Sequence, residues 1–189
     1  MYLLGHLGAA LLFYAPFSYV LVNRDRPMLA VFGGVCVLTF AMAPDVDLWL
    51  PFVSHRGPTH SLAFAVFFGA LVGSLGRLVA AIGRRSEHSG GAFTTLGGTA
   101  GTLAVCSHLL ADSITPRWRH AERLLSLEPF WPLAPWSVSV NLARAGDPAL
   151  NIGTLCLGLT AVSISWFWTM TPDPEGGSAE TPATLDSTD

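Results

Sequence analysis

The chain has 189 residues and a formal net charge of −3, and 12% of its residues are charged. Soluble domains carry about 25% charged residues, so this composition, with a mean hydropathy of +0.48, indicates a membrane protein. All ten basic residues are Arg and are scattered along the chain, which excludes a nucleic-acid-binding surface. The three Cys residues lie in apolar runs, and their spacing fits neither a disulfide framework nor a zinc knuckle.

Five apolar segments predict membrane-spanning helices, because a helix needs about 20 mostly apolar residues to cross a bilayer. The first contains Pro16, the second is short and should end at Pro44, and the fourth is rich in Gly and Thr, as close helix packing in lipid favours. In chain order the segments are 2–22, 28–43, 61–82, 92–112 and 149–170. We therefore predict an all-α, polytopic transmembrane bundle of about five helices, formed by residues 1–170.

The segments between these helices differ in character. Residues 23–27 and 83–91 are short and polar, whereas 44–60 carries several Asp and His residues. Residues 113–148 form a long stretch rich in Pro and Trp, which we expect to lie along the membrane surface. The acidic tail, 171–189, has the composition of a disordered segment.

Counting the predicted crossings places the conspicuous His and Asp residues on one side of the membrane. His6 lies in the first turns of the first helix, the 44–60 loop returns to that side, and the fourth helix brings His108 and Asp112 back to it. His88 falls on the opposite side. The distribution of Arg favours the opposite side as the cytoplasmic one, so we predict a multi-pass cell-membrane protein whose site faces away from the cytoplasm.

Two pairs of residues could bind a metal through their spacing. Asp45 and Asp47 stand in a Pro-Asp-Val-Asp turn, and carboxylates so close repel each other unless a cation or an Arg lies between them. His108 and Asp112 are four residues apart, which stacks them on one helix face. The alternatives are a turn of solvated carboxylates and a histidine bonded to a carboxylate within the bundle.

The segment His-Arg-Gly-Pro-Thr-His-Ser at 55–61 contains two histidines that flank a turn. Arg56 offers a fixed positive charge for an anionic substrate or transition state. Thr59 or Ser61 can cap the third helix, and interfacial histidines beside a plain Thr59 cap are the alternative for this segment. His6, inside an apolar helix, is a candidate ligand or a histidine bonded to a backbone carbonyl.

These residues form a set of imidazoles and carboxylates without thiolate, which suits a divalent ion, with zinc as the first choice and manganese or iron as others. They are more than one tetrahedral zinc needs, so either two ions bind or some residues position the others. The predicted catalytic residues are Asp45, Arg56 and His60. The predicted metal ligands are His6, Asp47, His55, His60, His108 and Asp112.

Over residues 1–135 the chain resembles the LexA-regulated, membrane-bound metal-dependent hydrolase family. The resemblance lies in His6, the Pro-Asp-Val-Asp turn at 44–47, the segment 55–61, and His108 with Asp112; a Pro-Phe pair at 129–130 adds weak support. The segment 55–61 is the specific part. The resemblance implies a hydrolytic activity without naming a substrate.

The first functional hypothesis is therefore an integral-membrane, metal-dependent hydrolase that acts on a phosphoester or lipid-like substrate through metal-activated water. Its expected partners are the lipid bilayer and a small-molecule or lipid substrate. The alternative is a non-enzymatic metal- or ion-binding membrane protein or a transporter, since His and Asp within the membrane also build ion pathways. Donors gathered at one membrane face count against transport.

Overall fold

The computed structural model describes residues 1–53, 55–83, 87–115, 127–138, 140, 142 and 144–170, with the backbone alone at 87–89 and 170. The described chain forms five α-helices and two short 3₁₀ helices, which confirms the all-α prediction. In chain order they are α1 (Leu3–Val22), α2 (Pro27–Phe40), η1 (Ala43–Trp49), η2 (Pro58–His60), α3 (Leu62–Ile82), α4 (Glu87–Ile114) and α5 (Pro148–Met170). The predicted tail, 171–189, lies outside the described residues.

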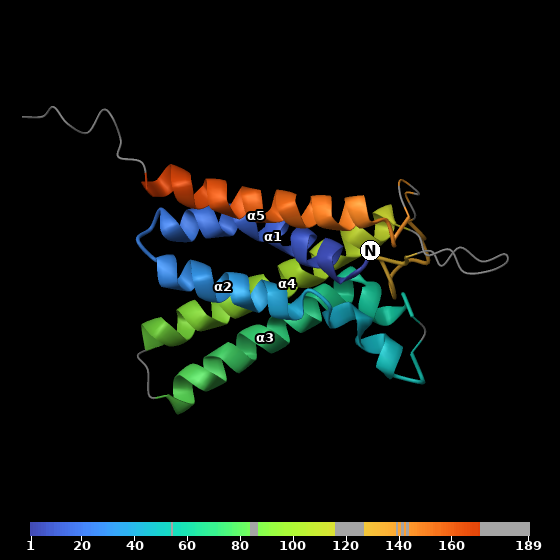
Figure 1. Cartoon of the computed structure of the whole chain (residues 1–189). Helices are drawn as coiled ribbons and strands as arrows, with labels where there is room; N and C mark the ends of the chain where they lie inside the picture. Colours follow the sequence, from blue (N-terminus) through green and yellow to red (C-terminus); the bar gives the residue numbers. More distant parts are fainter. Residues whose placement is uncertain are drawn as a thin grey trace, which may run out of the picture.

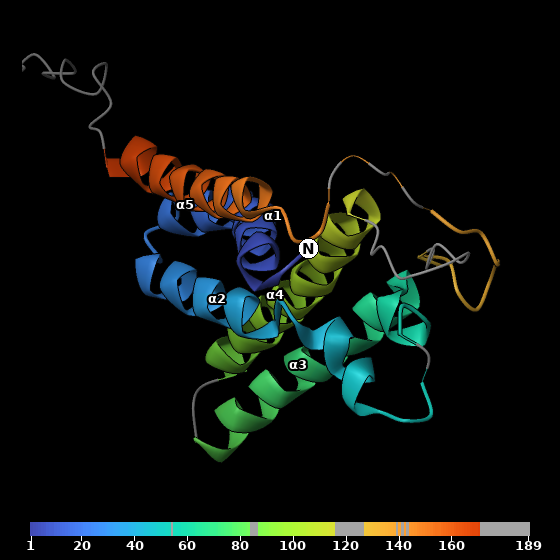
Figure 2. The same cartoon turned by 45° about the vertical axis from the view of Figure 1, so that its right-hand side comes forward.

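The five helices form a bundle in which α1, α3 and α5 run one way and α2 and α4 the other (Figure 1). The most extensive packing joins α1 to α5 and α3 to α4, while α2 and α4 also contact α1. Figure 2, turned by 45°, shows α4 crossing the middle of the bundle. As a result, the N-terminus, η1, η2 and the end of α4 meet at one end of the molecule.

Four helical segments of the described chain are long and apolar enough to cross a membrane: Leu3–Val22, Pro27–Trp49, Leu62–Ile82 and Pro148–Thr169. The fifth predicted crossing, α4, is helical as expected but is not among them. Several of its Gly residues face another helix rather than lipid, since Gly98 and Gly101 lie against Gly69 of α3. A central helix can therefore be less apolar than those that surround it.

Most predicted helix boundaries are confirmed within a residue or two, and the exceptions have local causes. The second helix ends at Phe40 rather than beside Pro44, because Pro44 instead lies in the first turn of η1. The fourth begins at Glu87, so residues 87–91 are helical and not part of the predicted loop. The side chain of Ser61, not Thr59, caps α3 by accepting a hydrogen bond from the backbone N–H of Phe64 at 3.1 Å.

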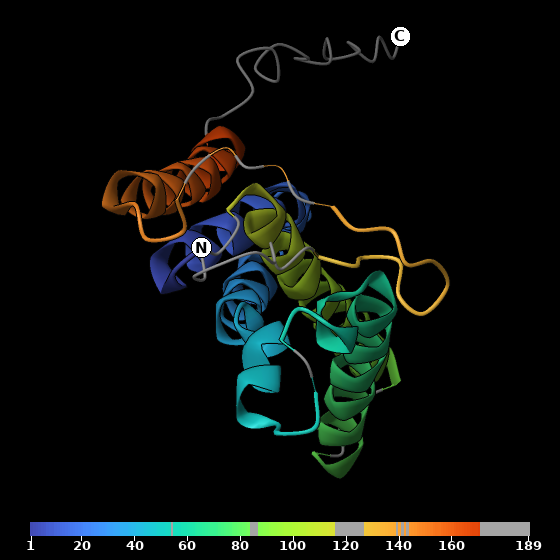
Figure 3. The same ribbon diagram turned by 90° about the vertical axis from the view of Figure 1, so that its right-hand side faces the viewer.

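The described part of the long loop lies at the end of the bundle that contains the N-terminus and the start of α3, the end that faces the viewer in Figure 3. The carbonyl oxygen of Pro129 accepts a hydrogen bond from the N–H of Leu62 at 2.8 Å, which fixes the loop to the start of α3. Trp131 and Trp136 are 41% and 68% exposed, in keeping with the predicted position along the membrane surface. Trp118, also in this loop, lies outside the described residues.

Small residues allow α3 and α4 to approach closely. A Cβ atom at Gly73 would lie 2.9 Å from the carbonyl oxygen of Thr94, closer than packed atoms tolerate. Gly153 on α5 is different, because a Cβ there would meet nothing within 4 Å. The Gly73 contact therefore fixes how near α4 lies to α3, and with it the position of the polar residues that α4 carries.

Replacing Gly73 by Ala should destabilise the protein by about 1–3 kcal/mol, since overpacking pushes the two helices apart. The matched change Gly153→Ala should leave the stability unchanged or raise it by up to about 1 kcal/mol, because Ala favours helix. Thermal unfolding in detergent, followed by circular dichroism, measures both. Equal melting temperatures for the two variants would show that the close contact does not determine stability.

Candidate metal centre

The bundle brings five residues of the predicted site together at one end. His6 lies in the first turn of α1, Asp45 in η1 and His60 at the end of η2, and His108 and Asp112 lie in the last turns of α4. His6, His60 and His108 are completely buried or nearly so, and Asp112 is 5% exposed. Four separate segments of the chain therefore contribute ionisable side chains to one buried cluster.

Four atoms of this cluster form a ring in which imidazole and carboxylate alternate. Nε2 of His60 lies 3.6 Å from Oδ1 of Asp45 and 3.8 Å from Oδ2 of Asp112. Nε2 of His108 lies 3.5 Å and 3.9 Å from the same two oxygens. We call these four residues the His/Asp ring. Its sides are too long for ordinary hydrogen bonds.

The size of the ring matches a tetrahedral metal site. An ion with bonds of about 2.1 Å to four tetrahedral ligands holds those ligands about 3.4 Å apart. Neighbouring ligands of an octahedral ion with the same bond length would be about 3.0 Å apart. A square with sides of the observed length would need bonds of about 2.6 Å, which is long for zinc. The four sides of the ring, 3.5–3.9 Å, are nearest in length to a tetrahedral edge. A tetrahedral site also needs both diagonals at that length, and the donor atoms that all lie within 4.8 Å of one another are those of His6, His108 and Asp112 and those of Asp45, His55 and His60.

Both histidines of the ring are held so that Nε2 can act as a ligand. Nδ1 of His108 lies 2.8 Å from the carbonyl oxygen of Ala41, which can only accept, so Nδ1 carries the proton. Nδ1 of His60 lies 3.1 Å from Oδ2 of Asp47. Neither Nε2 atom has a hydrogen-bond partner in the described part of the chain, although both are buried. A neutral, buried lone pair aimed at carboxylates is what a metal ligand requires.

Asp47 lies behind His60 rather than within the ring. Its Oδ2 accepts hydrogen bonds from the hydroxyl of Thr59 at 2.7 Å and from the backbone N–H of Arg56 at 3.2 Å. Its Oδ1 lies 2.9 Å from Nδ1 of His55. The structure thus places Asp47, a predicted ligand, where it orients two histidines. Sequence reasoning missed this role of Thr59, which it treated only as a possible cap.

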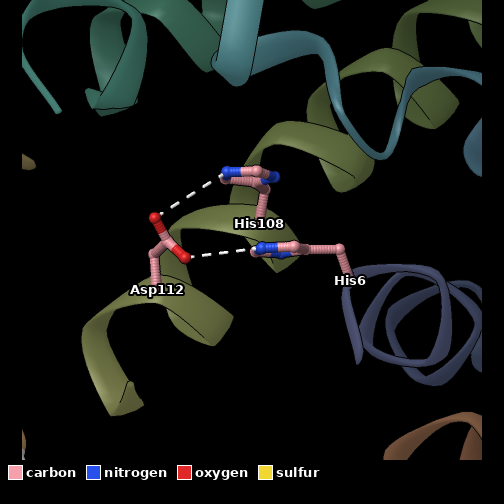
Figure 4. Close-up of side chains that lie close together, drawn as sticks. All are labelled: His6, His108 and Asp112. Atoms are coloured by element: carbon pink, nitrogen blue, oxygen red, sulfur yellow. Dashed lines mark ion pairs between the residues drawn. The ribbon is translucent and has the colours of Figure 1, made fainter. Parts of the chain in front are cut away.

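His6 stacks on His108, with ring centroids 3.9 Å apart and an angle of 7° between the planes (Figure 4). Its Nε2 lies 3.0 Å from the carbonyl oxygen of Met1 and 3.4 Å from Oδ1 of Asp112. Its Nδ1 is buried and has no hydrogen-bond partner among the described residues. His6 therefore bonds a carbonyl, which is one of its two sequence expectations, and its role as a metal ligand stays a prediction.

The remaining predicted residues adjoin the ring. His55 lies near His60, with ring centroids 5.2 Å apart. Ligand atoms of Asp45, His55 and His60 lie within 4.8 Å of one another, as do those of His6, His108 and Asp112. The donor set therefore exceeds the four atoms of the ring, as the sequence predicted.

Arg56 is 4% exposed and contacts the ring oxygen of Asp112. Its Nη2 is 3.1 Å from Oδ2 of Asp112 and donates to the carbonyl oxygen of Thr115 at 3.3 Å. Its φ of 65° is in the left-handed region, which costs about 1–3 kcal/mol for a residue of this kind and is found where surrounding contacts enforce it. The Arg56 side chain thus lies against a ring carboxylate, where it offsets negative charge.

Asn151 lies in the first turn of α5 but does not cap this helix. Asp147 is the cap, since its Oδ1 accepts from the backbone N–H of Ala149 at 2.9 Å. The side chain of Asn151 instead accepts from the N–H of Tyr2 at 2.9 Å and donates to the carbonyl of Ala145. It therefore fixes the start of α1, four residues before His6. The sequence contained no signal for this long-range contact.

Comparison with known proteins shows which family the chain belongs to. The model of the YdjM inner membrane protein family matches residues 1–174. The chain belongs to this family. It is also 27% identical over 164 residues to the putative cobalt transport protein CbiM 1 of Methanocorpusculum labreanum, an alignment that covers 86% of this chain and 60% of that relative. The chain thus spans less than two thirds of the relative's length. No solved structure matches it.

Membership of an inner-membrane family agrees with the multi-pass membrane protein that the sequence predicts. It also agrees with the coarser part of the resemblance, namely a membrane-bound family. The hydrolytic activity and the regulation by LexA that the resemblance implies stay predictions, and so does the side of the membrane that the site faces.

The variants His60→Ala and His108→Ala should each lose most of the zinc that the purified protein binds, because each removes one Nε2 from the ring. His88→Ala is the matched control, since residue 88 begins α4 at the opposite end of the bundle. Elemental analysis of protein saturated with zinc and then desalted measures the stoichiometry. Equal zinc content in all three variants would rule out the ring as the binding site.

Replacing Asp47 by Asn should weaken zinc binding by about 10–100-fold without abolishing it, since groups that orient a ligand have effects of this size. The amide keeps an oxygen beside Thr59 but no longer carries the charge that His60 Nδ1–H faces. Competition with a fluorescent chelator measures the affinity. A loss of binding as complete as that of His60→Ala would instead make Asp47 a direct ligand.

Proposed function

We propose that this chain is a membrane protein that binds a divalent ion at the His/Asp ring and uses it to hydrolyse an ester or phosphoester bond. The observation that carries the proposal is the ring itself: two buried Nε2 atoms without hydrogen-bond partners among the described residues, each held 3.5–3.9 Å from the carboxylates of Asp45 and Asp112. Zinc is the first choice for such ligands and spacing, and manganese or iron also accepts imidazole and carboxylate.

The ring residues divide into three ligands and one base. Asp45 is the most exposed of them, with 14% of its side chain accessible, and it lines a cleft of about 510 Å³ between the end of α2 and η1. His60, His108 and Asp112 are more deeply buried. Catalytic zinc sites keep one position for water or substrate. We therefore assign the buried three as ligands, and we assign Asp45, the most accessible corner of the ring, as the group that would leave its corner to a water molecule and act as the general base.

A bound zinc ion lowers the pKa of a coordinated water to about 7 and polarises the scissile bond. Asp45 accepts the proton from the attacking water, and its position in the cleft lets it pass this proton to the leaving group. Arg56, 3.1 Å from Asp112, limits the negative charge of the ligand set and so favours an anionic substrate. Residues 44–47 and 55–61 resemble the metal-dependent hydrolase family, and this resemblance supports the same reaction.

Transport of a divalent cation is a second candidate, and the similarity to a protein named as a putative cobalt transporter favours it. The comparisons thus support transport more directly than hydrolysis. The geometry supports a fixed site, because the described donors gather at one end of the bundle and a buried Arg lies among them. A conducting path needs polar groups along its length, and an arginine in contact with a ring carboxylate repels a passing cation.

One variant separates the two functions. Asp45→Asn should lower kcat for hydrolysis by about 10²–10⁴-fold, because it removes the base, while zinc stoichiometry stays near that of the unmodified protein. The assay uses zinc-loaded protein in detergent with soluble and lipid phosphoesters. Arg77→Gln is the control, since residue 77 lies in the last turns of α3, at the other end of the bundle.

Uptake measurements complete the test. Proteoliposomes containing the unmodified protein should accumulate no more zinc or cobalt than liposomes without protein. Cation uptake that His60→Ala abolishes, together with no hydrolysis of any phosphoester, would replace the hydrolase proposal with transport.

A further inference from the structure

An apolar groove of about 600 Å³ runs along the bundle between α2, α3 and α4. None of its lining residues carries a charge, and they include Leu29, Cys36 and Phe40 of α2, Leu75 and Val79 of α3, and Phe93 of α4. Its volume lies within the range of about 300–1,000 Å³ typical of small-molecule sites. Because α2 and α3 are apolar enough to cross a membrane, the groove opens to hydrocarbon.

The groove ends beside the cleft of the candidate metal centre, and the two share one lining residue. Phe40 lines the groove and also lines the separate cleft that contains Asp45. The other walls of that cleft include Met42, Val46 and Trp49, so Asp45 is the charged group in an otherwise mostly apolar entrance. The groove and the cleft therefore meet at the side chain of Phe40. The apolar walls of the groove lie on one side of it, and the cleft with Asp45 lies on the other.

The groove follows nearly the whole of α2. From Met28 in the first turn to Phe40 in the last it follows thirteen residues, which is about 18 Å of helix. A lipid of the leaflet on the ring's side would place its head near Asp45 at the end of the bundle and its chain along α2. A helix of a second copy could also fill the groove, but its binding would not explain why the groove adjoins the Asp45 cleft.

We propose that the groove is the acyl-chain subsite of this protein and that its ligand is a membrane lipid whose ester or phosphoester head group reaches the His/Asp ring. This proposal rests on the function proposed above in assigning the head group to the metal centre. The lipid enters from the side, between α2 and α3, rather than from water. Trp49, which lines the Asp45 cleft, and Phe52 are 85% and 95% exposed, which suits a position at the membrane interface.

Two exposed leucines of α3 provide a matched test. Leu75 lines the groove and is 55% exposed, whereas Leu78 is 54% exposed and is not part of the lining. Leu75→Trp fills the groove, and Leu78→Trp adds the same bulk elsewhere on the same helix. Cys36→Trp blocks the groove from α2, so that the result does not depend on one helix. Zinc stoichiometry, measured for each variant, reports whether the ring end stays folded.

The experiment uses phosphatidylglycerol with a photoactivatable group in its acyl chain, in nanodiscs that contain the full chain. Mass spectrometry gives the ratio of labelling in residues 28–40 to labelling in α5. In the unmodified protein this ratio should exceed that expected from exposed area by at least threefold. Leu75→Trp and Cys36→Trp should lower it by at least threefold, and Leu78→Trp should leave it unchanged.

A ratio that follows exposed area alone, or one that Leu75→Trp leaves unchanged, would overturn the groove proposal. So would cross-linking of residues 28–40 to a second copy of the chain in place of lipid. If the groove is labelled as expected but the protein binds no zinc, the acyl-chain subsite stands and the hydrolase proposal fails. If zinc binds and soluble phosphoesters are hydrolysed while labelling is unselective, the hydrolase proposal stands and the acyl-chain subsite fails.

Discussion

The His/Asp ring depends on hydrogen bonds made behind it, at the other nitrogen of each imidazole. Asp47 holds the Nδ1–H of His60, and the carbonyl oxygen of Ala41 holds that of His108. Without these contacts either ring could rotate or change tautomer, and its Nε2 would no longer aim a lone pair at Asp45 and Asp112. Both contacts come from the segment between α2 and η2, so one stretch of chain orients ligands on two other elements.

Helix packing determines where those ligands meet. His108 and Asp112 lie on α4, whose distance from α3 is limited by contacts such as Gly73 against the carbonyl oxygen of Thr94. Larger residues would displace α4 and carry both ligands away from His60. The Gly-rich composition makes α4 less apolar than the other helices, and it also lets the last turns of α4 complete the ring. The close approach of α4 to α3 therefore determines both the fold and the site.

The features that the sequence predicted well are those with a local signal. Apolar runs located all five helices, and the four-residue spacing of His108 and Asp112 predicted one helix face. Counting crossings predicted that distant His and Asp residues share one end. What the sequence could not predict were partners that carry no side-chain pattern, such as the carbonyl of Ala41. It made Asp45 a catalytic residue and Asp47 a ligand, but it could not show that a 3₁₀ turn directs Asp45 into the ring and Asp47 behind it.

The membrane restricts charged groups to the ends of the helices and apolar surface to their length, and this arrangement limits which ligands fit. Charged groups are costly at the bilayer centre, so a buried set of carboxylates and imidazoles is best tolerated where helices end near water. The same helices must be apolar along their length, and any groove between them is then filled by hydrocarbon. A site at the end of such a groove faces two media at once. A molecule that satisfies both is polar at one end and apolar for about 18 Å, the length of α2 that the groove follows, and this description fits a lipid better than a free ion or a soluble ester.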